Sequence, residues 1–211
     1  MPETWHAMGV MLSAAGSLAW LRNTVAPGVE YGELVKAAAE WEPGVEGLTF
    51  LPYLAGERTP HADPDARGSF TGLSLRHDRG ALVRAVLEGV AFGLRDSLDL
   101  IAELGPLPDR GRVSGGGARS EEWLRIVASV LELPLERTAA DESAAFGAAL
   151  LGGVAGGLWG SAAEAAEAAV LPTTTVDPVA DWIPAYAEGR ETFRTLYPAI
   201  RDVVMPRPRS A

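Results

Sequence analysis

The sequence predicts an α/β domain in which helices flank a mixed β-sheet. Two observations carry this prediction. Apolar residues recur at helical spacing in several segments, and short β-rich runs bounded by glycine or proline lie between those segments. The chain has 211 residues, of which 47% are hydrophobic, so it is long enough to bury a core of its own.

The N-terminal quarter alternates between helical and extended patterns. Residues 8–22 begin as a β-like run and continue as a helix, and residues 31–41 predict a second, shorter helix. Residues 48–54 form an apolar, β-rich run and predict a strand. A turn-rich loop follows at residues 55–69, and loops of this length inside a domain are often functional.

The strongest periodic signal lies in the centre of the chain. Apolar residues follow one another at four-residue steps, which predicts a long helix that ends before Gly105-Pro106. The residues that form this stripe are Leu82, Val86, Val90, Leu94 and Leu98.

The second half repeats the pattern of strand and helix. A C-terminal helix is expected to dock back on the domain after an exposed linker. The predicted elements are a strand at 112–114, a helix at 120–131, a strand at 135–138, a helix at 143–155, the linker at 177–184 and the terminal helix at 186–200.

Three consecutive glycines, residues 115–117, connect a predicted strand to a predicted helix. Glycines let the backbone approach a flat base or a phosphate without a Cβ clash, and Ser120 is a good cap for the helix that follows. Taken alone, such a run is more often a tight connection than a ligand site. The small residues of the 143–155 helix, and Tyr31 at the start of another, could flank a planar ring.

Composition excludes several classes of protein. The net charge of −10 argues against non-specific binding to nucleic acid or to an anionic membrane. The chain has no cysteine, which excludes disulfides and Cys-ligated zinc. The apolar stretch at residues 8–20 is too short to span a bilayer, so a soluble cytoplasmic protein is expected.

Motifs along nearly the whole chain resemble the FGGY family of carbohydrate kinases, and within it the bacterial xylulokinases. The segment from Phe50 to His61 is similar to the FLPYLSGERTPH-type segment of that group. The other similar segments, in the family's order, are Val10 to Ser17, Gly68 to Leu73 with Leu82 to Val90, Gly115 to Ser120, and Asp141 to Leu151.

This resemblance implies a fold and a reaction. Such kinases have two RNase H-like domains of the actin, hexokinase and heat-shock protein superfamily, and they use ATP and Mg²⁺ to phosphorylate a sugar, here D-xylulose. Residues 1–205 would be the C-terminal, nucleotide-binding domain, truncated at its N-terminus, and 206–211 a flexible tail. The sugar-binding domain, with the catalytic base and most Mg²⁺ contacts, would lie upstream of Met1. The chain alone is therefore expected to be inactive and to have no metal site.

The resemblance also implies site residues. Glycine backbone would lie against adenine, and Arg58 could contact phosphate or the other domain. The sequence departs from the family at Glu121, where asparagine is common, and at Ala81, which suggests a lost helix cap. The nucleotide-binding residues that it implies are Ala15, Gly16, Tyr31, Gly116, Gly117, Ala118, Ser120 and Glu121.

Other hypotheses remain open at this point. The chain could be a stand-alone nucleotide-binding module without catalysis, or a kinase of another pentose or hexulose. It could also be a structural domain in which the glycines serve only a turn. Truncation would expose apolar surface or a sheet edge, which favours homo-oligomers.

Overall fold

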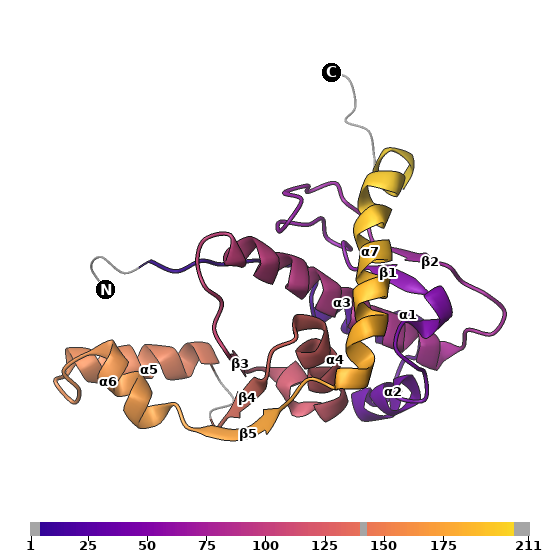
Figure 1. The fold of residues 1–211 in the computed structure, drawn as a ribbon. Helices are drawn as coiled ribbons and strands as arrows, with labels where there is room; N and C mark the ends of the chain where they lie inside the picture. The colour runs from indigo at the N-terminus through magenta and orange to yellow at the C-terminus, as the bar shows by residue number, and fades with distance from the viewer. Residues whose placement is uncertain (1–4, 140–142, 205–211) are drawn as a thin grey trace.

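A long central helix, α3 (Arg79–Ala102), organises a computed structural model that describes residues 5–139 and 143–204 (Figure 1). Helices α2 (Tyr31–Ala38) and α4 (Glu121–Leu131) and strand β1 (Thr49–Leu51) pack against it. A Cβ at Gly89 would lie 2.1 Å from the Phe50 carbonyl oxygen, so the glycine lets α3 lie directly on β1.

Two small sheets flank this helix. Strands β3 (Gly111–Val113) and β4 (Leu135–Thr138) are parallel, and β5 (Pro172–Val176) pairs with β4 in the antiparallel sense. The three strands form the mixed sheet that the sequence predicts. The second sheet joins β1 to β2 (Ser69–Thr71) as an antiparallel pair.

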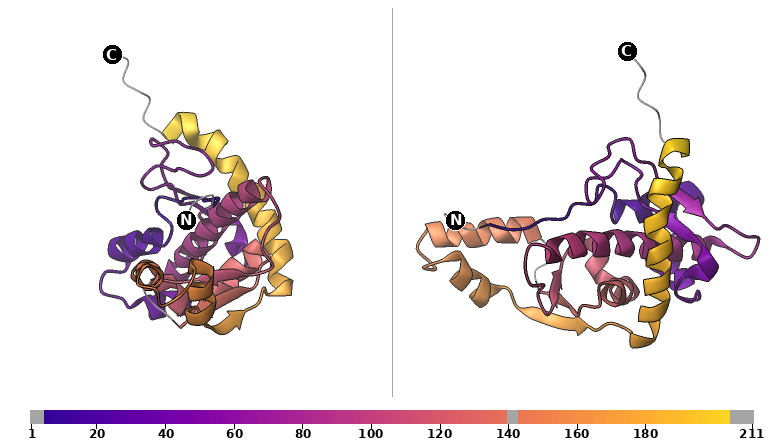
Figure 2. Two further views of the ribbon diagram at one scale, coloured as in Figure 1. Left: turned by 90° about the vertical axis from the view of Figure 1, so that its left-hand side faces the viewer. Right: turned by 45° about the horizontal axis from the view of Figure 1, so that its top comes forward.

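The remaining helices lie around this centre. Helix α1 (Gly16–Val25) packs on α3, and α7 (Ile183–Val204) crosses the protein as its longest peripheral element. Helices α5 (Ser143–Ala155) and α6 (Ala162–Ala169) form a hairpin that projects from the rest of the protein in Figure 1 and in the right view of Figure 2.

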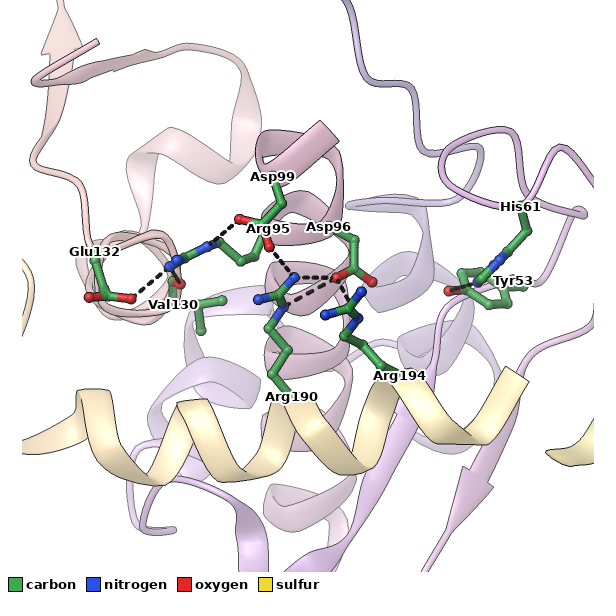
Figure 3. A network of polar contacts seen from close by, with 9 residues as sticks. All are labelled: Tyr53, His61, Arg95, Asp96, Asp99, Val130, Glu132, Arg190 and Arg194. Atoms are coloured by element: carbon green, nitrogen blue, oxygen red, sulfur yellow. Dashed lines mark hydrogen bonds and ion pairs between the residues drawn. The ribbon is translucent and has the colours of Figure 1, made fainter. Parts of the chain in front are cut away.

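Hydrogen bonds and ion pairs join α7 to α3 (Figure 3). The Arg190 guanidinium donates to Asp96 Oδ1 at 2.6 Å and also to Asp99. Beside these contacts, the rings of Phe193 and Phe92 pack with centroids 5.5 Å apart. Because Phe92 and Phe193 are both buried, α7 covers an apolar face of α3 as well as binding it through charge.

Several predicted elements have different bounds in the structure. The strand expected at 48–54 is confined to β1, since Pro52 has no N–H to donate to a ladder. The β-like run from residue 8 is not a strand, and α1 begins only at Gly16. The linker expected at 177–184 is partly helical: a 3-10 turn covers Ala180–Trp182, and the Trp182 ring packs on Tyr186 with centroids 6.1 Å apart.

The expected loss of a helix cap is wrong. The Asp78 side chain accepts a hydrogen bond from the Ala81 amide at 3.0 Å and also one from the Trp41 indole at 2.9 Å. The cap of α3 therefore lies three residues before Ala81, which is itself fully buried. The tail at 206–211 lies outside the described residues.

Candidate functional site

A cavity of about 650 Å³ opens between α1, α2, α3 and the glycine segment that precedes α4. Its volume is in the range of small-molecule sites, and its walls are mainly apolar. None of the described residues that line it is acidic. The lining residues are Ala14, Ala15, Leu18, Tyr31, Gly32, Val35, Val86, Leu87, Val90, Gly116, Gly117, Arg119, Ser120 and Trp123.

The glycine segment forms one wall of this cavity. Gly115 has φ of 86°, in the left-handed region, and the chain then makes a 3-10 turn over Gly116–Arg119. Ser120 caps α4, because its hydroxyl accepts from the Trp123 amide at 3.2 Å, which confirms the predicted cap. A Cβ built on Gly116 meets no atom within 4 Å, so the backbone there is open to a ligand.

Tyr31 stands at the rim of the cavity and is 43% exposed, so it is not a core tyrosine. The Arg22 guanidinium lies over its ring, 4.7 Å from the centroid. An exposed aromatic ring beside an apolar cavity can stack on a planar ligand, and the cation fixes its orientation.

The structure brings together five of the residues implied for nucleotide binding, and three others lie outside the cavity wall. Gly16 begins α1 next to a lining residue, and Glu121 is the exposed first residue of α4. The Ala118 carbonyl instead accepts from Arg137 Nε at 2.8 Å, which anchors the glycine segment to β4. The five that line the cavity are Ala15, Tyr31, Gly116, Gly117 and Ser120.

Sequence reasoning missed most of the apolar wall. Val86 and Val90 come from the periodic stripe of α3, and that stripe predicts buried residues whether or not a ligand lies beside them. Trp123 of α4 lies against Gly117, where a Cβ would lie 3.0 Å from the indole nitrogen.

The loop that follows β1 lies beside a second, smaller cavity of about 390 Å³. His61 lines it, stacked on Tyr197 with centroids 3.7 Å apart and 3.2 Å from the Tyr53 hydroxyl (Figure 3). Burial lowers the pKa of His61. Arg58 is exposed and lines neither cavity, and no described carboxylate pairs with its guanidinium. Its role in phosphate or interdomain contact stays a prediction.

Glu57, in the same loop, connects it to the segment that enters the first cavity. Its Oε1 atom accepts from the Leu12 amide at 3.2 Å and from the Arg58 amide at 2.7 Å. Its side chain is buried, which raises its pKa, and Oε2 has no partner among the described residues. Glu57 therefore ties Leu12, just before the lining residues Ala14 and Ala15, to this loop, a contact that its sequence context did not reveal.

The cavity fits a nucleotide better than a metal ion. A planar base can enter between apolar walls and approach the backbone at Gly116, where a side chain would intrude. Within residues 5–139 and 143–204, by contrast, no group of three or more His, Asp or Glu side chains could hold a cation.

Comparisons with known proteins agree with the motifs. Residues 1–156 match the C-terminal domain of the FGGY family of carbohydrate kinases. The xylulose kinase of Escherichia coli is 40% identical over 202 residues, which are 93% of this chain and 40% of that protein. The xylulose kinase of Bacillus subtilis is 32% identical over 95% of this chain and 40% of its own length.

Solved structures agree with the fold. The crystal structure of a xyloylose kinase from Brucella ovis superposes with a TM-score of 0.84 and 38% identity, over 96% of this chain and 41% of that one. The chain therefore spans about two-fifths of the length of these relatives. No helix of the described part is long and apolar enough to cross a membrane.

Family match and fold lead to the same assignment. The predicted α/β architecture, with a mixed sheet flanked by helices, is that of the sugar kinases with the actin-like fold. The chain belongs to the FGGY family of carbohydrate kinases and carries the family's C-terminal domain.

Proposed function

We propose that this chain is the nucleotide-binding half of an ATP-dependent xylulokinase, which converts D-xylulose and ATP to D-xylulose 5-phosphate and ADP. The main support for the proposal is the apolar cavity, one wall of which is formed by Gly116 and Gly117, with open backbone at Gly116. The relatives named xylulose kinases support the choice of sugar.

In this proposal the chain binds and orients the nucleotide but does not activate the sugar. The adenine would enter between Leu87 and Val90 on one side and the glycine segment on another, with Tyr31 at the rim. None of the described residues of the cavity wall is a carboxylate that could take the proton of a sugar hydroxyl, so in this proposal the base lies outside this cavity. Phosphoryl transfer depends on positioning, so the half-site alone should be inactive.

Two measurements test the proposal. Calorimetric titration should detect ADP-Mg²⁺ binding to the purified chain and no response to added D-xylulose. A Gly117→Asp variant should lose the binding, because its side chain would enter beside Trp123 and place a negative charge against the space proposed for the base. Absence of ADP binding to the wild-type chain would contradict the nucleotide role.

The activity assay tests the second part of the proposal. A coupled assay should show no D-xylulose-dependent release of ADP by the chain above the Gly117→Asp control. Release well above that control would show that the chain is a complete catalyst. A stand-alone binding module would give the same ADP titration, and a kinase of another sugar would differ only in the substrate of the complete enzyme.

The proposal extends to location and assembly. A sugar kinase that draws on ATP would act in the cytoplasm, and D-xylulose would bind mainly through a partner domain. The outer edge of β3 pairs with no described strand, so β3 offers a place for self-association or for such a domain.

A further inference from the structure

Arg84 is a charged side chain in the core of the protein, with 1% of its surface exposed. Its guanidinium donates to three elements. Nε donates to Glu88 Oε1 within α3 at 2.8 Å, Nη1 to Glu122 Oε1 of α4 at 3.0 Å, and Nη2 to the Tyr186 hydroxyl of α7 at 2.6 Å. A buried guanidinium with this many fixed partners holds their relative positions.

The contact with Glu122 reaches the wall of the nucleotide cavity. Glu122 lies in the first turn of α4, two residues after Ser120, and Ser120 both caps that turn and lines the cavity. The first turn of α4 therefore follows directly on the glycine segment and is joined to it through Ser120. α3 supplies the facing residues Leu87 and Val90, three and six positions after Arg84.

We infer that the Arg84–Glu122 ion pair is a positioning pair for nucleotide binding. It fixes the distance between the α3 wall and the segment Gly116–Ser120, so that a base fits between them. Neither Arg84 nor Glu122 lines the cavity, so the pair acts through the residues that do. This inference rests on the proposed function and extends it to residues that touch no ligand.

A second, more exposed ion pair at the other end of α4 serves as the control (Figure 3). Arg95 of α3 donates to Glu132 Oε1 at 2.8 Å and to the Val130 carbonyl at 2.9 Å. This pair joins the same two helices, and neither Arg95 nor Glu132 lines the cavity. Loss of the Glu132 contact should loosen the helix pair without moving the glycine segment.

Glu122 is the residue of the pair to substitute. Truncating Arg84 would leave the buried Glu88 without its counter-charge and could unfold the protein. The Glu122 side chain is 17% exposed, and its other oxygen also accepts from Arg125 at 3.4 Å within α4. Glu122→Ala should fold, and Glu122→Gln keeps an acceptor oxygen for the guanidinium.

The experiment compares wild type with Glu122→Ala, Glu122→Gln and Glu132→Ala. All are measured at a temperature well below the thermal unfolding midpoint of each protein. ADP affinity is measured by calorimetry and amide exchange by mass spectrometry. Glu122→Ala should weaken ADP binding about tenfold, the loss expected for one charge-assisted hydrogen bond, and speed exchange in residues 115–121. Glu122→Gln should recover part of both effects. Glu132→Ala should leave both unchanged.

The outcomes separate this inference from the proposed function. Equal effects of Glu122→Ala and Glu132→Ala on ADP affinity would overturn the inference, because a general loosening of the helix pair would then explain the loss of affinity. If the wild-type chain binds no ADP, the proposed function fails. Amide exchange of residues 115–121 tests the role of the ion pair even in the nucleotide-free protein. Unchanged exchange in Glu122→Ala would by itself overturn the inference.

Discussion

Replacing Gly116 by alanine tests whether the glycine segment meets a ligand or serves only as a turn. Gly116 lines the cavity, its φ lies outside the left-handed region, and a Cβ there meets no protein atom within 4 Å. The substitution should therefore cost the fold little. If a base lies against this backbone, however, the added methyl group occupies space that the ligand needs.

The size of the effect follows from packing. Forcing an extra methyl group into a filled contact costs about 1–3 kcal/mol, which corresponds to an increase in the Kd for ADP of roughly 5- to 150-fold. Gly117→Ala would be a less clean test. Its Cβ would lie 3.0 Å from the Trp123 indole nitrogen, so the protein itself would have to move.

The assay is titration of ADP-Mg²⁺ into wild type and Gly116→Ala, with thermal unfolding followed in parallel. The matched control is Gly105→Ala in the loop after α3, where a Cβ also meets no atom within 4 Å and the residue does not line the cavity. The control should bind ADP as wild type does. Wild-type affinity in Gly116→Ala would refute the contact between ligand and backbone, whereas equal weakening in both variants would refute its specificity.

Three further predictions concern stability and titration. Burial raises the pKa of Glu88 to about 7 from 4.5 in the unfolded chain, so the folded state holds a proton that the unfolded state releases. The free energy of unfolding should therefore fall by roughly 3 kcal/mol as pH rises through this window. In urea unfolding, the Glu88→Gln variant should not show this fall with pH. Asp78→Ala should lower the unfolding free energy by about 1 kcal/mol, measured in urea at pH 7, because α3 loses its cap; no change would contradict the cap. The Tyr197 hydroxyl donates a hydrogen bond to Asp63 at 2.7 Å, which lowers the pKa of the Asp63 carboxyl. Tyr197→Phe should therefore raise the pKa of Asp63 in an NMR titration, and an unchanged value would contradict this cause.

The helices were largely predictable because their signals are local. The four-residue steps that start at Leu82 mark the buried face of α3, and Ser120 marks the start of α4. Helix α6 and strand β5 were not predicted. The alanine-rich α6 has no apolar stripe to set its register, and four of the five residues of β5 are exposed, so neither shows a burial pattern in sequence.

The candidate site was predictable only where its residues are neighbours in sequence. Gly116, Gly117 and Ser120 form one motif, and the structure places all three on the cavity wall. The facing wall depends on how α3 packs against α4, and Leu87 has the same apolar character in a core as beside a ligand. The buried contacts of Arg84 also join distant segments, which no local pattern encodes.

The central claim is that the larger cavity binds a nucleotide, and amide NMR spectra of the chain during an ADP-Mg²⁺ titration test it most directly. The account predicts saturable shifts concentrated at Tyr31, Gly116, Gly117 and Ser120. A titration that leaves these amides unchanged, or that shifts residues around His61 at the second cavity instead, would contradict it.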